Sequence, residues 1–323
     1  PGPGPPRSAD EDLWLIYLCC HPALSREARI ALTLRAAGGL SAAEIAAAFL
    51  IPEATMAKRL TRARDKIRDS GLALAMPHGD ALEARTADVL EVVYLIFTAG
   101  HQAAAGEDLI RPDLCVAAVN LARGLVARRP RDPEVLGLLA LLLLTDARRA
   151  ARTDPAGDLV LLEDQDRTRW DQAMIAEGED LLVRALRLGS AGRYQLQAAV
   201  AACHSTAATA AATDWRQISV LYGELMRWDP SPVTEANRAV AVAMAEGPAA
   251  GLTILDVLAG HPQLATWPRI HMARADLLRR MGRAGEAAEA YRAALELEPS
   301  PAERRFISLR LERAGRPFRP EHL

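Results

Sequence analysis

The sequence predicts an all-α protein, and three observations support this fold class. Of its 323 residues 50% are hydrophobic but only 4% are aromatic, whereas strand-rich proteins depend on aromatic and β-branched residues. Alanine, leucine, arginine and glutamate dominate instead, and these residues favour helices. Segments with helical patterning also follow one another from Asp12 to the C-terminal region, separated mostly by short turns that contain glycine or proline.

Composition and motifs exclude several classes of protein. The longest apolar run, Leu136–Leu144, is half of the about 18 residues that a membrane span needs, and no signal peptide is visible. The four cysteines are too few for a disulfide framework, which fits a cytoplasmic protein. The seven histidines are scattered and no nucleotide-binding glycine loop occurs, so we expect neither an enzyme nor a cofactor. The net charge of −2 leaves room for one basic element.

The N-terminal part predicts a short linker followed by a compact helical unit. Residues 1–11, which begin with a Pro/Gly run, are interpreted as a linker or tag remnant. Residues 12–75 form the unit, with boundaries around Met76–Asp80. Its expected elements are a helix over Asp12–Cys20, a helix that starts at Ser25 and ends at Gly38-Gly39, a helix opened by the capping box Ser41–Glu44, and a helix over Glu53–Asp69 after the Ile51-Pro52 break.

The rest of the chain predicts a helical extension over residues 80–230 and tetratricopeptide-like repeats over residues 231–323. The starts of two similar segments, Gly247 and Gly285, lie 38 positions apart, near the tetratricopeptide period of about 34. Asp158–Glu163 has strand character but is interpreted as an ordered loop. The expected helices are Asp80–Thr98, Pro112–Ala127, Pro133–Arg152, Arg169–Arg187, Tyr194–His204, Asp214–Arg227, Pro232–Ala245, Pro248–Ala259, Trp267–Met281, Glu286–Leu297 and Pro301–Arg313.

The segment Ser41–Arg68 predicts a helix-turn-helix that binds DNA. Its second helix has one apolar face, made by Met56, Leu60, Ala63 and Ile67. Its other faces carry six basic residues against Glu53 and Asp65, and the six include both lysines of the chain. A recognition helix presents such side chains to base edges and phosphates. The alternative is an ordinary solvated basic face.

Two segments of this unit, Leu40–Ala46 and Ile51–Arg64, resemble region 4 of extracytoplasmic-function sigma factors. The motifs Cys19–Leu24, Val93–Phe97 and Leu161–Arg167 resemble one subgroup, which carries a long extension with tetratricopeptide-like repeats. The resemblance implies binding to the promoter −35 element and to the β flap of RNA polymerase. It assigns base reading to Thr55, Lys58, Arg59, Thr61 and Arg62, and phosphate contacts to Arg64, Lys66 and Arg68.

The resemblance also implies that the extension regulates activity through contacts with a protein or peptide. Region 2 of such factors is missing from this sequence, so the chain is not expected to initiate transcription unaided. The alternatives are a tetratricopeptide-like interaction scaffold and a helix-turn-helix regulator that is not a sigma factor. The apolar surplus of the helix after residue 80, which includes Val89, Val93 and Ile96, predicts that the extension packs against the first unit.

Two short clusters suggest metal binding, but no metal site is expected. Cys19-Cys20-His21 lacks a partner pair with zinc-ligand spacing, and buried thiols at a helix end are the favoured interpretation. The segment Glu163–Asp166 lacks the glycine and the terminal glutamate of a calcium loop. Asp166 or Thr168 is expected instead to cap the next helix.

Overall fold

The computed structural model describes residues 15–49, 51–69, 79–101, 111–189, 191–265, 267–297 and 299–314. These residues are mainly helical and contain no strand, only an isolated antiparallel bridge between Thr153 and Leu159. The predicted all-α class is therefore confirmed. The α-helices are α2 (Arg26–Ala36), α3 (Ala42–Phe49), α4 (Glu53–Asp69), α5 (Asp80–His101), α6 (Pro112–Arg128), α7 (Pro133–Asp146), α8 (Gln172–Arg187), α9 (Arg193–Ser205), α10 (Trp215–Leu225), α11 (Pro232–Glu246), α12 (Pro248–Ala259), α13 (Pro268–Arg280), α14 (Ala284–Glu296) and α15 (Pro301–Ala314).

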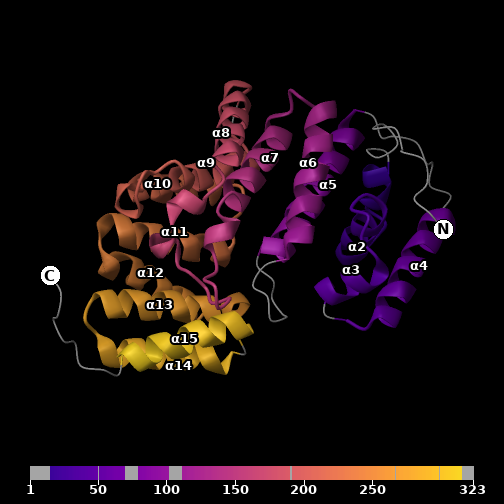
Figure 1. Cartoon of the computed structure of the whole chain (residues 1–323). Helices are drawn as coiled ribbons and strands as arrows, with labels where there is room; N and C mark the ends of the chain where they lie inside the picture. The colour runs from indigo at the N-terminus through magenta and orange to yellow at the C-terminus, as the bar shows by residue number, and fades with distance from the viewer. Residues whose placement is uncertain are drawn as a thin grey trace.

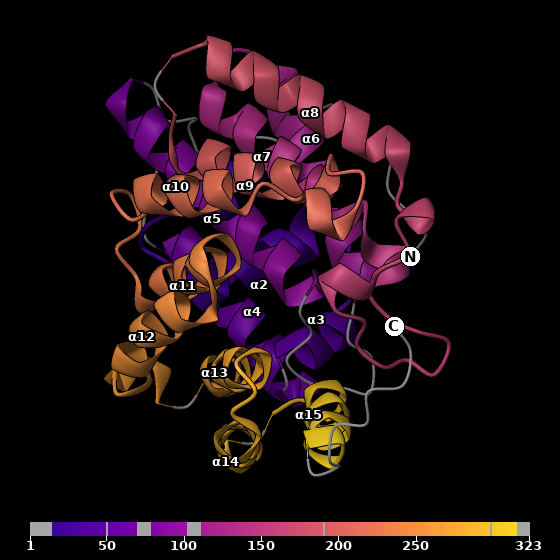
Figure 2. The same ribbon diagram turned by 90° about the vertical axis from the view of Figure 1, so that its left-hand side faces the viewer.

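The helices follow one another through space in nearly the order of the sequence. Figure 1 shows α2, α3 and α4 at one side of the molecule, next to the long α5 and α6. The helices α7 to α9 lie in the middle, and α11 to α15 form a stack of neighbouring helices at the other side, with α10 above it. Figure 2 shows the same stack below α9 and α10. The N-terminal unit and the C-terminal stack are thus joined through the middle helices.

Local signals define the N-terminal unit as the sequence predicted. Ser25 caps α2 by accepting a hydrogen bond from the Ala28 amide, and Gly39 follows that helix with a φ of 72°, which favours glycine. Before α3, Ser41 Oγ accepts from the Glu44 amide at 3.2 Å and Glu44 Oε2 accepts from the Ser41 amide at 2.6 Å. The capping box is therefore confirmed.

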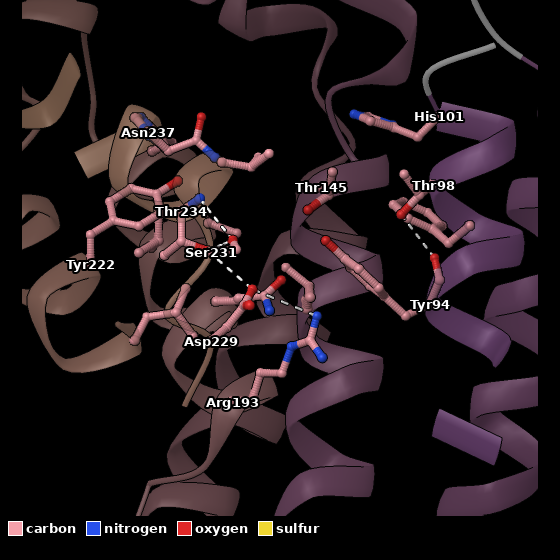
Figure 3. Close-up of a pocket in the computed structure, with 18 of the residues that line it drawn as sticks. Tyr94, Thr98, His101, Thr145, Arg193, Tyr222, Asp229, Ser231, Thr234 and Asn237 are labelled. Carbon is pink, nitrogen blue, oxygen red and sulfur yellow. Dashed lines mark hydrogen bonds and ion pairs between the residues drawn. The ribbon is translucent and has the colours of Figure 1, made fainter. Parts of the chain in front are cut away.

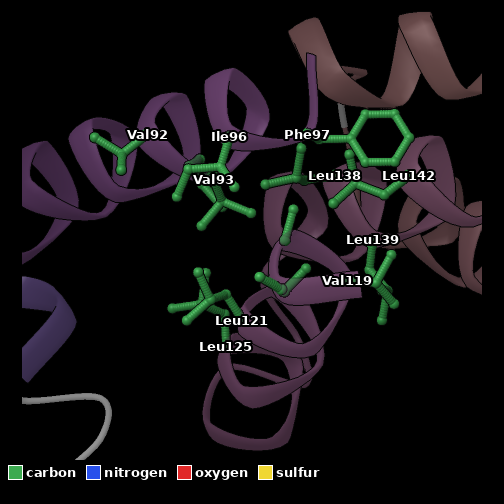
Figure 4. Packing of buried hydrophobic residues seen from close by; sticks show 14 of the residues in the cluster. Val92, Val93, Ile96, Phe97, Val119, Leu121, Leu125, Leu138, Leu139 and Leu142 are labelled. Carbon is green, nitrogen blue, oxygen red and sulfur yellow. The ribbon is translucent and has the colours of Figure 1, made fainter. Parts of the chain in front are cut away.

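The core is divided into two main hydrophobic clusters. The first runs from Ile16 to Ala201 and includes residues from α2 to α9, so the N-terminal unit and the following helices share one core. The second runs from Ala236 to Ile307 and belongs to α11–α15. Figure 4 shows part of the first cluster, in which side chains of α5, such as Val93 and Ile96, gather near those of α6 and α7.

Helix α5 also packs against α2 and the residues before it. The Tyr17 hydroxyl and Thr86 Oγ1 are 2.6 Å apart in a buried hydrogen bond. Arg29 pairs with Asp88 at 2.9 Å, and Arg26 pairs with Glu91 at 3.2 Å. The expectation that this helix packs against the first unit is therefore confirmed, although its apolar residues Val93 and Ile96 gather with side chains of α6 and α7.

Side chains from one helix complete the ends and crossings of others. Glu134 of α7 accepts hydrogen bonds from the Tyr194 and Gln195 amides at 3.1 and 3.3 Å, which caps the N-terminus of α9. In the C-terminal stack, α12 approaches α11 closely at Gly251. A Cβ atom there would lie 2.4 Å from the Ala239 carbonyl oxygen, so only glycine allows this distance.

Three expectations for the segment after α7 were wrong. The predicted helix Pro133–Arg152 ends at Asp146. The Ala147 carbonyl accepts a hydrogen bond from the Asp171 amide at 2.9 Å and so makes no further bond within the helix. A 3₁₀ turn follows at Arg149–Ala151. The next α-helix begins at Gln172 rather than Arg169. Its cap is Asp171, whereas Asp166 caps a separate 3₁₀ turn that contains Thr168.

The segment Asp158–Glu163 is an ordered loop, as expected. It is held to the C-terminal stack by ion pairs: Glu163 pairs with Arg280 of α13 at 2.8 Å, and Asp158 pairs with Arg305 of α15. The loop therefore connects the middle of the chain to the end of the stack. The interpretations of residues 1–11 and of the boundary at Met76–His78 lie outside the described residues.

Candidate nucleic-acid interface

Helix α4 has one buried face and one exposed face. Met56, Leu60 and Ala63 are buried, and α4 packs against α2 and α3 on this side. Ile67, the fourth predicted member of the apolar face, is half-buried. Because these residues are spaced three or four positions apart, all intervening positions point away from the unit's core. The predicted amphipathic pattern is therefore confirmed, and it presents the basic residues outward.

The predicted DNA-contacting residues are nearly all exposed. Arg59 is half-buried, with its guanidinium 5.9 Å from the centre of the Phe49 ring. The exposed ones are Thr55, Lys58, Thr61, Arg62, Arg64, Lys66 and Arg68. Side chains so placed are able to reach a ligand as large as a DNA duplex without a rearrangement of the fold.

Five of these eight residues line one surface groove of about 380 Å³, which we call the α2–α4 groove. One wall is formed by Leu24, Ser25 and Ala28, at the start of α2. The other wall is formed by Thr55, Lys58, Arg59, Arg62 and Lys66. Thr61, Arg64 and Arg68 do not line this groove. The structure therefore separates the predicted set into a groove-lining group and three residues outside it.

The charges of α4 are compensated unevenly. Arg68 pairs with Asp65 at 2.8 Å and with Asp69 at 3.0 Å; Asp69 belongs to the helix and adds a third acidic residue to the two that were counted from the sequence. Among the described residues, no ion pair involves Lys58, Arg62, Arg64 or Lys66. The Thr61 hydroxyl donates to the Ala57 carbonyl at 3.0 Å, which leaves its oxygen as an acceptor. The uncompensated positive charge of α4 therefore lies along its middle part, at Lys58, Arg62, Arg64 and Lys66.

The cysteine pair near the N-terminus is structural. Cys19 and Cys20 are buried, and Cys20 Sγ lies 3.7 Å from Thr33 Oγ1. Burial raises the pKa of the Cys20 thiol to about 12, so the group is protonated and a poor metal ligand. His21 Nδ1 accepts a hydrogen bond from the Ala23 amide at 3.1 Å. These contacts support buried thiols at a helix end.

A different cluster of possible metal ligands was missed from the sequence, because its members lie on three separate helices. His101, Cys115 and Asp146 are buried with potential ligand atoms within 4.8 Å of one another. The Asp146 carboxylate is already paired with Arg149. Burial and the neighbouring cations Arg152, Arg148 and Arg149 lower the pKa of His101 to about 2. So much positive charge disfavours a divalent cation at this cluster.

Comparisons with known proteins agree with the architecture of the N-terminal unit. Residues 14–67 match the family described as sigma-70, region 4, and residues 85–186 match a family of unknown function, DUF6596. The fold and the exposed basic helix thus define a protein with a sigma factor-like DNA-binding domain. None of the described helices has the length and apolar character needed to cross a bilayer.

The similarity to a further protein extends over almost the whole chain. The chain is 41% identical over 303 residues to the uncharacterized protein R00370 of Rhizobium meliloti (strain 1021). The alignment covers 94% of this chain and 71% of that protein. The chain therefore belongs to the same family as R00370.

Proposed function

We propose that this chain is part of a transcription initiation factor of the extracytoplasmic-function sigma type, acting in the cytoplasm. The observation that supports this best is the basic face of α4, where Lys58, Arg62 and Lys66 line one groove while the opposite face of the helix is held by α2 and α3. A match to sigma-70 region 4 over residues 14–67 points to the same class of DNA-binding protein.

The groove suggests how the DNA contacts are divided. The proposed −35 readers Thr55, Lys58, Arg59 and Arg62 line it together, whereas Thr61 stands outside. Arg64, Lys66 and Arg68 are proposed to contact phosphates. Arg68 should contribute least to phosphate binding, because it already pairs with Asp65 and Asp69. Phosphate contacts fix the register of the protein on the duplex, and base contacts carry the specificity.

For the remainder of the chain we propose a regulatory role through protein contacts. The proposed units are an extension over residues 80–230 and tetratricopeptide-like repeats over residues 231–323, and the separate hydrophobic cluster of α11–α15 supports the second boundary. A groove of about 620 Å³ opens beside this stack, with Met244, Met272 and Phe306 in its lining. Flexible methionines and aromatic rings suit contact with a partner protein or peptide.

Binding to selected DNA tests the proposal. A duplex enriched from a random pool by the full chain is titrated by fluorescence anisotropy at several salt concentrations. We expect Arg62→Ala and Lys58→Ala to weaken binding by about 1–3 kcal/mol where the side chain reads a base. Arg64→Ala should reduce the slope of affinity against salt by about one unit for every duplex. Arg187→Ala is the matched control, because Arg187 is exposed on α8. Unchanged affinity in both Arg62→Ala and Lys58→Ala would refute the recognition helix.

Binding to RNA polymerase separates the proposal from its alternatives. The full chain is incubated with core polymerase, with and without an isolated flap of the β subunit as competitor. A sigma-type domain should bind the core and be displaced by the flap fragment. DNA binding without polymerase binding would indicate a regulator that is not a sigma factor, and binding to neither would indicate a protein-interaction scaffold.

A further inference from the structure

A cavity of about 500 Å³ lies between the middle helices and the start of the C-terminal stack. Its walls come from α5, α7 and α9 on one side and from α10 and α11 on the other, with Leu162 of the ordered loop between them. In Figure 3, Tyr94, Thr98 and Thr145 face Asp229, Ser231 and Thr234 across this space. The volume falls within the range of about 300–1,000 Å³ that is typical of sites for small molecules.

Arg148 lines the cavity without a counter-ion. Its Nε is enclosed, and among the described residues the guanidinium makes no hydrogen bond or ion pair. Its neighbours are the Trp170 ring, whose centre is 6.0 Å away, and a second cation, Arg167, which stacks on the same ring at 4.3 Å. Burial and the charge of Arg167 lower the pKa of Arg148 to about 10. Apart from the Trp170 ring, the nearest charged group to this half-buried cation is another cation, an arrangement that binding of an anion beside it would stabilise.

Two histidines add further unused hydrogen-bonding atoms to the same wall. The Nδ1 atoms of His101 and His204 are enclosed and have no partner among the described residues. Burial and nearby arginines lower the pKa of His204 to about 4, as they lower that of His101, so both rings are neutral near pH 7. A neutral imidazole can donate one hydrogen bond to an anion and carries no charge that would need compensation.

The opposite part of the lining contains the second arginine and the one carboxylate. Arg193 lies 3.9 Å from Asp229, too far for a hydrogen bond, and its enclosed Nε has no partner among the described residues. Its guanidinium is 5.9 Å from the centre of the Tyr94 ring. Asp229 accepts a hydrogen bond from Thr234 Oγ1 at 3.1 Å. The lining therefore holds two arginines against one carboxylate, and it is completed by the apolar residues Phe97, Leu141, Leu162, Val200, Ala201, Leu225 and Val233.

We propose that this cavity binds a small organic anion, whose carboxylate or phosphate group pairs with Arg148 and accepts a hydrogen bond from His101 or His204. The apolar part of the ligand lies against Phe97, Leu141 and Val200. Arg148 supplies the charge that the described structure leaves uncompensated, and the neutral rings of His101 and His204 supply hydrogen bonds of defined direction. The inference does not depend on the DNA-binding role, because no residue of α2–α4 takes part.

Thermal shift and calorimetry with simple probes test the site in the full chain. Benzoate, phenyl phosphate and inorganic phosphate serve as anions, and benzamide is the neutral counterpart of benzoate; ionic strength is held constant and the buffer contains no phosphate. We expect benzoate or phenyl phosphate to raise the Tm with increasing concentration, since a ligand that binds only the folded state stabilises it. Benzamide should leave the Tm unchanged. If benzoate binds with the higher affinity, the natural anion is a carboxylate; if phenyl phosphate does, it is a phosphate.

Substitutions locate the binding. Arg148→Gln should weaken the affinity for the tighter anion at least tenfold, because truncation of a buried charge pair has effects of this size or larger. Without ligand, the same variant should melt at the wild-type temperature or above it, which a purely structural arginine would not do. Arg187→Gln on α8 and Lys58→Ala in the α2–α4 groove should bind the anion as the wild type does.

Several results would overturn the proposal. An equal response to benzamide and benzoate would show an apolar site without a role for Arg148. The absence of a Tm response to any of the three anions at millimolar concentration would also contradict it. The same holds if Lys58→Ala abolishes anion binding while Arg148→Gln leaves it intact. If Arg148→Gln fails to fold, the wild-type comparison of benzoate with benzamide still decides. Arg193→Gln is then expected to weaken the binding of the anion, whereas Arg187→Gln is expected to leave it unchanged.

Discussion

The contact between Tyr17 and Thr86 is the most informative point at which to perturb the interface between the N-terminal unit and α5. Thr86 Oγ1 lies 2.7 Å from the Leu82 carbonyl, to which it donates its proton. Its bond with the Tyr17 hydroxyl, at 2.6 Å, therefore has the tyrosine as the donor. Both side chains are buried, so water does not compete for this hydrogen bond.

This direction of donation predicts unequal effects of the two single substitutions. Tyr17→Phe removes one hydrogen bond but leaves Thr86 satisfied, and it should lower the free energy of unfolding by about 0.5–1.5 kcal/mol. Thr86→Val leaves a buried hydroxyl donor without an acceptor and should lower it by about 1–3 kcal/mol. The double variant has no buried hydroxyl without a partner, so its free energy of unfolding should fall by about as much as that of Tyr17→Phe alone.

Urea denaturation followed by circular dichroism measures all three variants. Thr98→Val is the matched control: Thr98 lies on the same helix and also donates to the carbonyl four residues earlier, at 2.9 Å, but it is only half-buried and contacts no tyrosine hydroxyl. Its effect should stay within about 0.5 kcal/mol. Additive losses in the double variant would refute the assignment of Tyr17 as donor and the view that this bond secures the interface.

Three further predictions concern packing, capping and acid stability. Gly251→Ala should destabilise the chain by about 1–3 kcal/mol in thermal melts, whereas Gly223→Ala, whose Cβ meets no atom within 4 Å, should stabilise it by about 0.5–1 kcal/mol; equal effects would contradict the close crossing. Glu134→Ala should lower stability by about 0.5–2 kcal/mol and accelerate hydrogen exchange of the Tyr194 amide. Because the folded-state pKa of His204 is lowered to about 4, acidification from pH 6.5 towards 4 protonates the unfolded chain first, and stability falls by about 1.4 kcal/mol per pH unit; His204→Gln should show a shallower slope in denaturation at each pH.

Features set by neighbouring residues were predictable from the sequence. The capping box of Ser41 and Glu44 and the apolar spacing of Met56, Leu60 and Ala63 depend on positions three or four apart, where the helix itself makes the contact. The same periodicity gave the outward direction of the basic residues. The neutralisation of Arg68 by Asp69 is also local, and a complete count of the helix would have included it.

Features set by tertiary contacts were not predictable in this way. The helix α7 ends at Asp146 because the Asp171 amide, distant in sequence, bonds to the Ala147 carbonyl. The cavity depends equally on distant residues, since His101, Arg148 and His204 come from separate elements and share no spacing motif. Single arginines and histidines in helices are usually solvated, so nothing in the pattern distinguished Arg148 from the other arginines of the chain.

The distribution of the basic residue types gives the protein an unusual chemical selectivity. Only two of its 39 lysine and arginine residues are lysines, Lys58 and Lys66, and both are exposed in the α2–α4 groove. Reagents that acylate primary amines and leave guanidinium groups intact will therefore modify no lysine outside this helix. Two positive charges can be erased from the groove without mutagenesis. The protection of these two amines, read by mass spectrometry, would report directly on whatever covers the groove.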